Sequence, residues 1–172
     1  MEIKNLNAIR TMKPPRIVSI SKKTLVGVRT RTTLASDDPV SYWKPFRMRL
    51  AEIQHADVAR FYSVQVMDTD GGPFTPHTEF EKWAAVEVTA TGTIPEGMDS
   101  LMIPAGEYAV FTHIGTPAAF HITMKYIFSE WLPSSEFEVD ARPHFEVMES
   151  NYRPDDPHAV EEVWIPIENK ST

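Results

Sequence analysis

The segment Val160-Glu161-Glu162-Val163-Trp164-Ile165-Pro166-Ile167 places two acidic residues inside an apolar run near the end of the chain. Its composition is typical of a β-strand, in which successive side chains point to opposite faces of a sheet. Glu162 then shares a face with Trp164 and Pro166, whereas Glu161 lies on the other face. If one side of the sheet is covered, one of the two glutamates is drawn toward the interior.

An acid that points inward on this strand needs compensation. A buried carboxylate is costly unless a partner, a proton or a cationic ligand replaces its lost hydration. An acid beside an aromatic ring, as Glu162 lies beside Trp164, suits a pocket for a cationic or amphipathic organic molecule. The alternative is an edge strand with both glutamates near solvent and only Trp164 in the core. A bulge would exchange the two faces and bring Glu161 inward instead.

The composition of the chain excludes several classes of protein. The chain has 172 residues, 42% of them hydrophobic, and it contains no cysteine. This length predicts one domain or two small fused halves, and without cysteine there is no disulfide framework and no thiol nucleophile. No apolar run reaches the ~18 residues of a membrane span, and residues 1–7 lack the apolar stretch of a signal peptide. We therefore expect a cytoplasmic protein with no membrane contact.

The charge of the chain and its first residues argue against DNA binding. The formal net charge is -7, which disfavours direct binding to nucleic acid but permits cationic ligands. Residues 1–15 show no clear periodicity and end in Pro14-Pro15, so we interpret them as an N-terminal arm. An arm of this length is too short for a helix-turn-helix, which needs two helices and a turn.

The first half of the chain is predicted to contain three strands and a helix. The strands are expected over residues 25–32, 59–67 and 81–91, from their alternation of apolar and polar residues. Asp37-Asp38-Pro39 is a helix-start signal, and Pro45 either begins the main helix or kinks it. Residues 68–73 are a strong turn signal, and residues 91–100 are expected to form a polar connection.

The second half of the chain repeats this order. A strand over residues 108–113 is followed by a helix from about Pro117 to Leu132, which Pro133 is expected to end, and then by strands over 143–148 and 159–167. The sequence thus predicts an α+β fold with one domain over residues 16–172. Two strand-helix-strand-strand repeats, at about 16–91 and 103–168, would form one antiparallel sheet with two helices on one face and a central ligand cleft.

Four motifs in the second half carry a resemblance to a known family. They are Ile103-Pro104-Ala105-Gly106-Glu107-Tyr108-Ala109-Val110-Phe111 with His113-Ile114-Gly115, then Tyr126-Ile127-Phe128-Ser129-Glu130-Trp131-Leu132-Pro133, Arg142-Pro143-His144-Phe145-Glu146, and Glu162-Val163-Trp164-Ile165-Pro166-Ile167. Together they resemble the bacterial effector-binding domain, also called the gyrase-inhibitor-like small-molecule-binding domain. The first half resembles it mainly in pattern, through Leu25-Val26-Gly27 and the two strands that follow.

The resemblance implies a two-repeat domain whose central pocket binds organic molecules, often cationic or amphipathic drugs. An acid on the last strand neutralises the ligand, and the motif match gives that role to Glu162, with Trp164 facing the same cavity. Family members occur as sensor modules of multidrug-responsive transcription factors. Others stand alone, and some of these interact with gyrase or hydrolyse strained electrophilic rings. Because no DNA-binding domain is fused here, the chain resembles the stand-alone kind.

Further residues are candidates for the pocket, each with a purely structural alternative. Trp131 lies on an apolar helix stripe and is as well suited to the core, while Trp83 occupies the corresponding strand of the first repeat. Tyr62 and Tyr108 would offer hydroxyl groups to a ligand, or simply satisfy backbone groups. The six histidines form no HxH or HxxxH pair, so we expect no metal site and no cofactor.

Three hypotheses on function follow. The first is a small-molecule-binding protein for sequestration or sensing, with Glu162 as counter-charge. The second is a hydrolase in which Glu162 activates water or protonates a leaving group and Tyr108 assists; Glu162→Gln would then abolish turnover but only weaken binding of a neutral ligand. The third is an acidic protein-interaction module, such as a topoisomerase modulator, with a partner that remains unknown.

Overall fold

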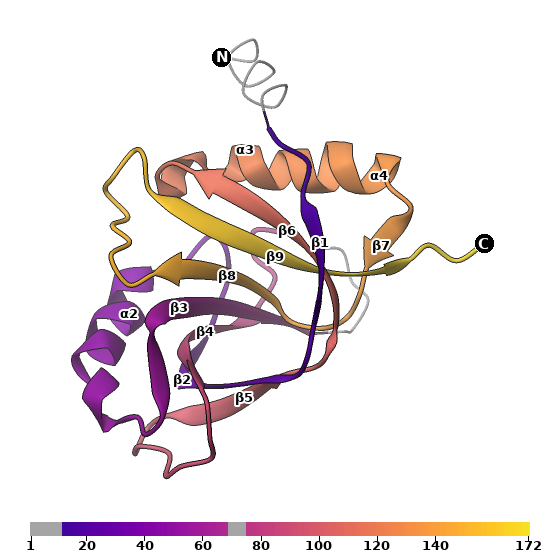
Figure 1. The fold of residues 1–172 in the computed structure, drawn as a ribbon. Helices are drawn as coiled ribbons and strands as arrows, with labels where there is room; N and C mark the ends of the chain where they lie inside the picture. The colour runs from indigo at the N-terminus through magenta and orange to yellow at the C-terminus, as the bar shows by residue number, and fades with distance from the viewer. Residues whose placement is uncertain (1–11, 69–74) are drawn as a thin grey trace.

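The computed structural model describes residues 12–68 and 75–172, and within them nine strands form one curled antiparallel sheet (Figure 1). The strand order is β1-β6-β9-β8-β3-β4-β2-β5, and β7 pairs with β9 off this path. The strands are β1 (Arg16–Ile20), β2 (Lys23–Thr32), β3 (Ala56–Met67), β4 (Phe80–Val88), β5 (Asp99–Ile103), β6 (Gly106–Ile114), β7 (Phe137–Val139), β8 (His144–Glu149) and β9 (Val160–Asn169). The predicted α+β class is confirmed.

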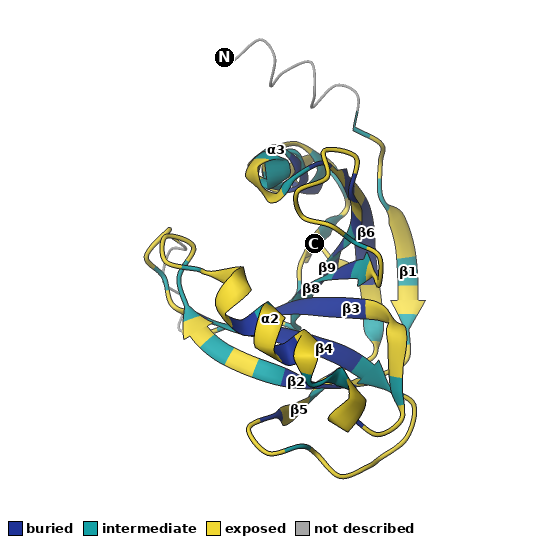
Figure 2. Cartoon of the chain, turned by 90° about the vertical axis from the view of Figure 1, so that its left-hand side faces the viewer, coloured by how far each residue is buried: buried dark blue, intermediate teal, exposed yellow. Residues whose placement is uncertain are grey.

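Two helical segments pack on the same side of the sheet, here called the helix face. Helix α2 (Pro39–Met48) lies over the β2–β4–β3 part, and a longer segment over residues 117–134, which contains α3 (Phe120–Lys125) and α4 (Leu132–Ser134), lies over β6 and β9 (Figures 1 and 2). The core under α2 contains Phe61, Ala84 and Val86, and the core under α3 contains Phe111 and other residues of β6 and β9. A third apolar cluster occupies the opposite face.

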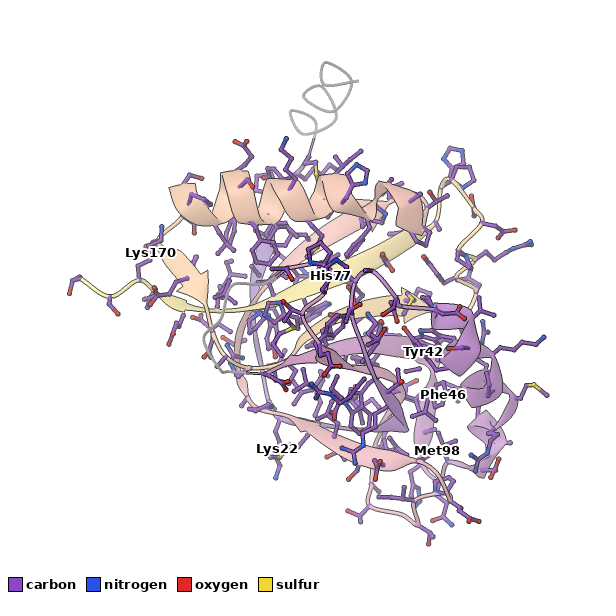
Figure 3. All side chains as sticks on the ribbon, turned by 180° about the vertical axis from the view of Figure 1, so that it is seen from behind. Lys22, Tyr42, Phe46, His77, Met98 and Lys170 are labelled. Atoms are coloured by element: carbon purple, nitrogen blue, oxygen red, sulfur yellow. The ribbon has the colours of Figure 1, made fainter. Side chains whose placement is uncertain are left out.

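Helix α2 begins at Pro39, where the fixed φ of proline suits the first helical position. Pro45 lies inside the helix, so it does not begin the main helix. Tyr42 and Phe46 form the buried side of α2, together with Met98 from the connection before β5 (Figure 3). The Tyr42 hydroxyl donates a hydrogen bond to Asp37 at 3.0 Å, which satisfies its polar end.

The second helical segment runs further than predicted. The sequence suggested an end before Pro133, but the helix continues to Ser134. The turn before the proline, Tyr126–Trp131, is π-helical. Proline lacks an N–H and its ring clashes with the carbonyl four residues earlier in a regular α-helix, and the wider turn relieves this conflict. The Ser134 hydroxyl then bonds to the carbonyl of Glu130 at 2.8 Å.

Most predicted strands are confirmed, and three short or split strands were missed. The β-branched region from Arg16 divides into β1 and β2 at residues 21–22. The connection predicted over 91–100 ends early, because β5 begins at Asp99, and β7 was not foreseen. The predicted turn at 68–73 and the arm at 1–15 lie largely outside the described residues. No helix within the described part of the chain is long and apolar enough to cross a membrane.

Gly27 is required where β2 crosses β4. A Cβ atom at this position would lie 2.7 Å from the Cα of Ala85, in the neighbouring backbone. Because two strands cannot separate locally without losing their ladder, only glycine fits here. The close approach of the two backbones explains the glycine in β2.

Candidate functional site

Strand β9 divides its two glutamates between the faces of the sheet. Glu161 is only 8% exposed and lies on the helix face, in register with His113 of β6 and Met148 of β8. Glu162 lies on the opposite face with Trp164, as the alternation predicted. The more deeply buried acid is thus Glu161.

Glu161 belongs to a polar strip that crosses the middle of the helix face. The strip contains residues of the four central strands, β4, β3, β8 and β9: Lys82, Ser63, Gln65, His144, Glu146 and Glu161. Apolar side chains packed under α2 lie on one side of it, and those packed under α3 lie on the other. The strip therefore occupies the part of the face between the two helix-covered clusters.

The carboxylate of Glu161 is poorly compensated. Burial raises its pKa to about 7, the negative charge of Glu146 adds to this effect, and Lys82 opposes it. Within the described residues no hydrogen bond or ion pair reaches this carboxylate. Glu146 differs, because the amide of Gln65 donates a hydrogen bond to it at 2.8 Å. A buried acid without a partner is a frequent mark of a functional site.

Aromatic side chains lie on several elements next to the acidic end of the strip. Tyr152, in the connection between β8 and β9, is half-buried, and burial together with the charges of Glu161 and Glu146 raises its pKa to about 12. From the α2 side, the Trp43 ring contacts the Phe61 ring edge-on at 6.2 Å between centroids. Phe61 is in register with Met148, the neighbour of Glu161.

On the α3 side, the ring of Phe120 contacts His113 at 5.2 Å between centroids. His113 is buried and satisfied, with ring nitrogens 2.7 Å from the Thr123 hydroxyl and 3.2 Å from the Thr116 carbonyl. Burial lowers the pKa of His113, and it lowers that of His144 to about 4, so both rings are neutral near pH 7. Neutral histidines leave the acids of the strip as its dominant charge.

Five of the six predicted ligand-binding residues lie together, on the face opposite the helices. Tyr62, Trp83, Tyr108 and Trp164 belong to one apolar cluster there, and Glu162 is at its margin. The Tyr62 hydroxyl bonds to Glu87 at 3.0 Å, the Tyr108 hydroxyl to the Pro143 carbonyl at 3.0 Å, and the Trp83 indole to Glu81 at 2.6 Å. These bonds give three of the side chains a structural role. Whether they also contact a ligand stays a prediction.

Glu162 forms an ion pair with Arg16 of β1, and the Arg16 guanidinium lies 5.9 Å from the centre of the Trp164 ring. The carboxylate of Glu162 therefore already has a cationic partner. The indole nitrogen of Trp164 is buried and has no hydrogen-bond partner among the described residues.

Trp131 is not brought together with the other predicted residues. It lies on the helix face, edge-on to Phe111 at 5.2 Å and stacked on Phe137 at 6.1 Å between ring centroids. The helix-stripe alternative, in which Trp131 belongs to the core, agrees with these contacts.

Sequence reasoning missed Glu146 and Tyr152. The signal for Glu146 was present, because it alternates with the buried Phe145 and Val147 of β8 as Glu161 alternates on β9. Tyr152 had none, since it lies in an irregular connection whose path no periodicity reveals. Among the described residues no group of His, Asp or Glu could hold a metal ion.

A curled antiparallel sheet with two helices on one face defines an α+β domain. The chain belongs to the family of GyrI-like small molecule binding domains, whose model matches residues 13–168. This confirms the family predicted from the motifs of the second half.

Individual relatives agree with this assignment. The transcriptional regulator BrlR of Pseudomonas aeruginosa is 37% identical over 93 residues, which cover 54% of this chain and only 34% of the regulator. The structure of SAV2435 bound to tetraphenylphosphonium has a TM-score of 0.66 at 18% identity, covering 91% of this chain and 94% of SAV2435. The C-terminal domain of EcmrR has a TM-score of 0.73 at 10% identity, covering 93% and 99%. At these identities the two structures show a shared fold. With a regulator among the relatives, the expected absence of nucleic-acid binding stays a prediction.

Proposed function

We propose that this chain binds a small cationic or amphipathic organic molecule on the helix face, between α2 and α3, with Glu161 as the counter-charge. The observation that carries the proposal is the carboxylate of Glu161, which is 8% exposed and has no hydrogen-bond or ion-pair partner in the described chain. Burying a carboxylate in this way costs free energy in the absence of a ligand. A bound cation would recover that energy, so the free protein is prepared for a positive charge.

Glu161 takes the role that the sequence assigned to Glu162. Glu162 keeps its own cation, Arg16, and a ligand would have to displace it. Among the described residues, Lys82 is the positive charge that acts on Glu161, and it forms no ion pair with the acid. The closing motif begins at Glu162, so the family resemblance by itself favours that residue; the assignment to Glu161 rests on its burial and on its lack of a partner among the described residues.

The rings near Glu161 suit the apolar part of such a ligand. Tyr152 lies within the electric field of the acid, and Trp43 and Phe120 approach from the two helices. Aromatic faces attract organic cations, each by about 0.5–2 kcal/mol depending on desolvation. A carboxylate with several aromatic rings beside it is thus suited to bind a lipophilic cation.

The site would lie at the junction of two repeats. Apart from the short β7, the segments β2-α2-β3-β4 and β6-α3-β8-β9 have the same order of elements, and β3 pairs with β8 where they meet. We infer that these are the repeats expected over 16–91 and 103–168, and that the ligand cleft lies above their junction. The family's name supports a small-molecule ligand, and the tetraphenylphosphonium bound to SAV2435 supports a cationic one.

The test is calorimetric titration of the full chain with tetraphenylphosphonium. Wild type should bind, and Glu161→Gln should raise the Kd by at least about tenfold, equivalent to about 1.4 kcal/mol. Glu162→Gln is the matched control, since it makes the same change one residue away on the other face, and should alter Kd by less than about threefold. Loss of affinity in Glu162→Gln alone would return the counter-charge to Glu162. No binding by wild type would contradict the proposal.

Hydrolysis is a second candidate at the same carboxylate. With a pKa of about 7, Glu161 holds both a protonated and an ionised form near neutral pH, which is what a general acid or base needs. Tyr152 would assist in place of Tyr108, whose hydroxyl is fully buried on the opposite face. Incubation with styrene oxide, followed by chromatography, tests this: turnover lost in Glu161→Gln and reduced in Tyr152→Phe supports it, and an unchanged epoxide contradicts it.

A further inference from the structure

A cavity of about 530 Å³ lies at the edge of the sheet where β6 continues past Arg16, the first residue of β1. Its walls come from residues 12–16, from the end of β6 and from the helical segment that contains α3, past which the chain enters β1 (Figures 1 and 2). Small-molecule sites have volumes of about 300–1,000 Å³. Neither Glu161 nor Glu146 lines this cavity, so it is distinct from the site proposed above.

The cavity exists because the β1–β6 ladder stops early. The last pair is Arg16 with Val110, and continuing the same register would place Pro14 opposite Thr112. Proline has no N–H and cannot donate to a ladder. Pro14 therefore cannot donate to the carbonyl of Thr112, and among the described residues no strand pairs with β6 beyond Val110 on this side.

Two backbone N–H groups of β6 point to this edge. The N–H of Gly115 donates to the carbonyl of Ala159 beside β9 at 2.9 Å. Because successive N–H groups of a strand alternate in direction, those of Thr112 and Ile114 point the other way, toward the cavity. Among the described residues no hydrogen bond reaches these two N–H groups, and the carbonyls of the same residues point the same way. The edge therefore offers donors and acceptors together, and the preference for an anion comes from the charge of the side chains around it.

The charge around the cavity is opposite to that of the chain. Among the described residues its lining contains Lys13 and Arg16 and no Asp or Glu, in a chain with a net charge of -7. Arg16 already pairs with Glu162, whereas Lys13 forms no ion pair within the described residues. The remaining walls, such as Val110 and Ile122, are largely apolar.

We propose that this cavity is a second ligand site, which takes an amphipathic organic anion. The carboxylate of the ligand would accept hydrogen bonds from the N–H groups of Thr112 and Ile114 and lie near Lys13. Its apolar body would lie against Ala119 and Ile122 of the helical segment. The two proposed sites then recognise ligands of opposite charge, and His113, which lines this cavity and lies in register with Glu161, stands between them.

The experiment titrates the full chain with decanoate by calorimetry, and repeats the titration with decyltrimethylammonium, which has the same chain length and a positive head. Lys13→Glu should weaken decanoate binding at least fivefold. Lys22→Glu is the matched control, because Lys22 is equally exposed and projects at the end of the molecule away from α3 (Figure 3). Lys22→Glu and Glu161→Gln should leave decanoate affinity within twofold of wild type.

Amide chemical shifts locate the ligand, and those of Thr112 and Ile114 should move with decanoate. Several results would overturn the proposal: no binding of decanoate, equal losses in the two lysine variants, shifts confined to the strip around Glu161, or equally tight binding of decyltrimethylammonium at this edge. Binding of an extended acidic peptide without decanoate would identify a strand-docking edge and also overturn it.

Discussion

Replacing Glu161 by glutamine should change how the stability of the protein depends on pH. The folded state holds the pKa of this acid at about 7, against an ordinary value of 4.5. Between these values the folded state keeps a proton that the unfolded chain releases, so the contribution of Glu161 to stability falls as pH rises. Below about pH 4.5 the carboxyl is protonated in both states and the penalty is absent.

The magnitude follows from the two pKa values. At about 1.36 kcal/mol for each pKa unit, an ionised Glu161 lowers the free energy of unfolding by about 3 kcal/mol at pH 8 and by less than about 1 kcal/mol at pH 5. Glutamine cannot ionise and has no such penalty at either pH. The stability of Glu161→Gln relative to wild type should therefore increase by about 2–3 kcal/mol between pH 5 and pH 8.

Urea denaturation followed by tryptophan fluorescence at several pH values measures this difference. The comparison of two variants is essential, because the lowered pKa of His144 makes its own contribution of opposite sign: stability rises with pH as that ring loses its proton in the unfolded chain. This contribution cancels in the difference. If the two pH profiles run parallel, the carboxylate is compensated in the folded protein and the reasoning behind the cation site is refuted.

Two further outcomes test the fold around the site. Gly27→Ala should destabilise the protein by at least about 2 kcal/mol in thermal unfolding, because the added Cβ meets the backbone of Ala85 at 2.7 Å; a loss within about 0.5 kcal/mol would show that the strands can shift. Arg142→Lys should lower the free energy of unfolding by about 2–4 kcal/mol. The Arg142 side chain bonds to Asp140 at 2.6 Å and lies 4.7 Å from the centre of the Tyr108 ring, and lysine cannot reproduce the planar guanidinium that makes both contacts. An unchanged melting temperature for this variant would contradict a stabilising role for the Arg142 guanidinium.

The pattern of the closing strand could be predicted from sequence, but its consequence for the site could not. Alternation correctly separates Glu161 from Glu162 on β9, and two-residue periodicity holds equally for both possible orientations. Which face becomes the more buried depends on side chains from distant segments. Arg16 neutralises Glu162 from the far end of the chain, and no spacing along the sequence indicates that encounter.

The helices show a similar division between local and distant causes. Asp38-Pro39 marks the start of α2 through the chemistry of two adjacent residues, and this signal needs no tertiary context. Pro133 is a local stop signal that the fold overrides, because a π-helical turn makes room for it. Tyr152, near the two acids, was beyond prediction, since the position of an irregular connection is fixed only by what it packs against.

The order of strands also bears on how the chain folds. The centre of the sheet pairs β3 with β8, so that Tyr62 lies opposite Val147, and β1 at the N-terminus pairs with β6. Both contacts join residues far apart in the chain, whereas α2 and the strands beside it are neighbours in sequence. Pairing of distant segments loses more chain entropy before any contact forms, and such topologies fold slowly. We therefore expect closure of the β3–β8 pairing to limit the folding rate, and the aromatic side chains of both faces to stay exposed to other molecules until it is complete.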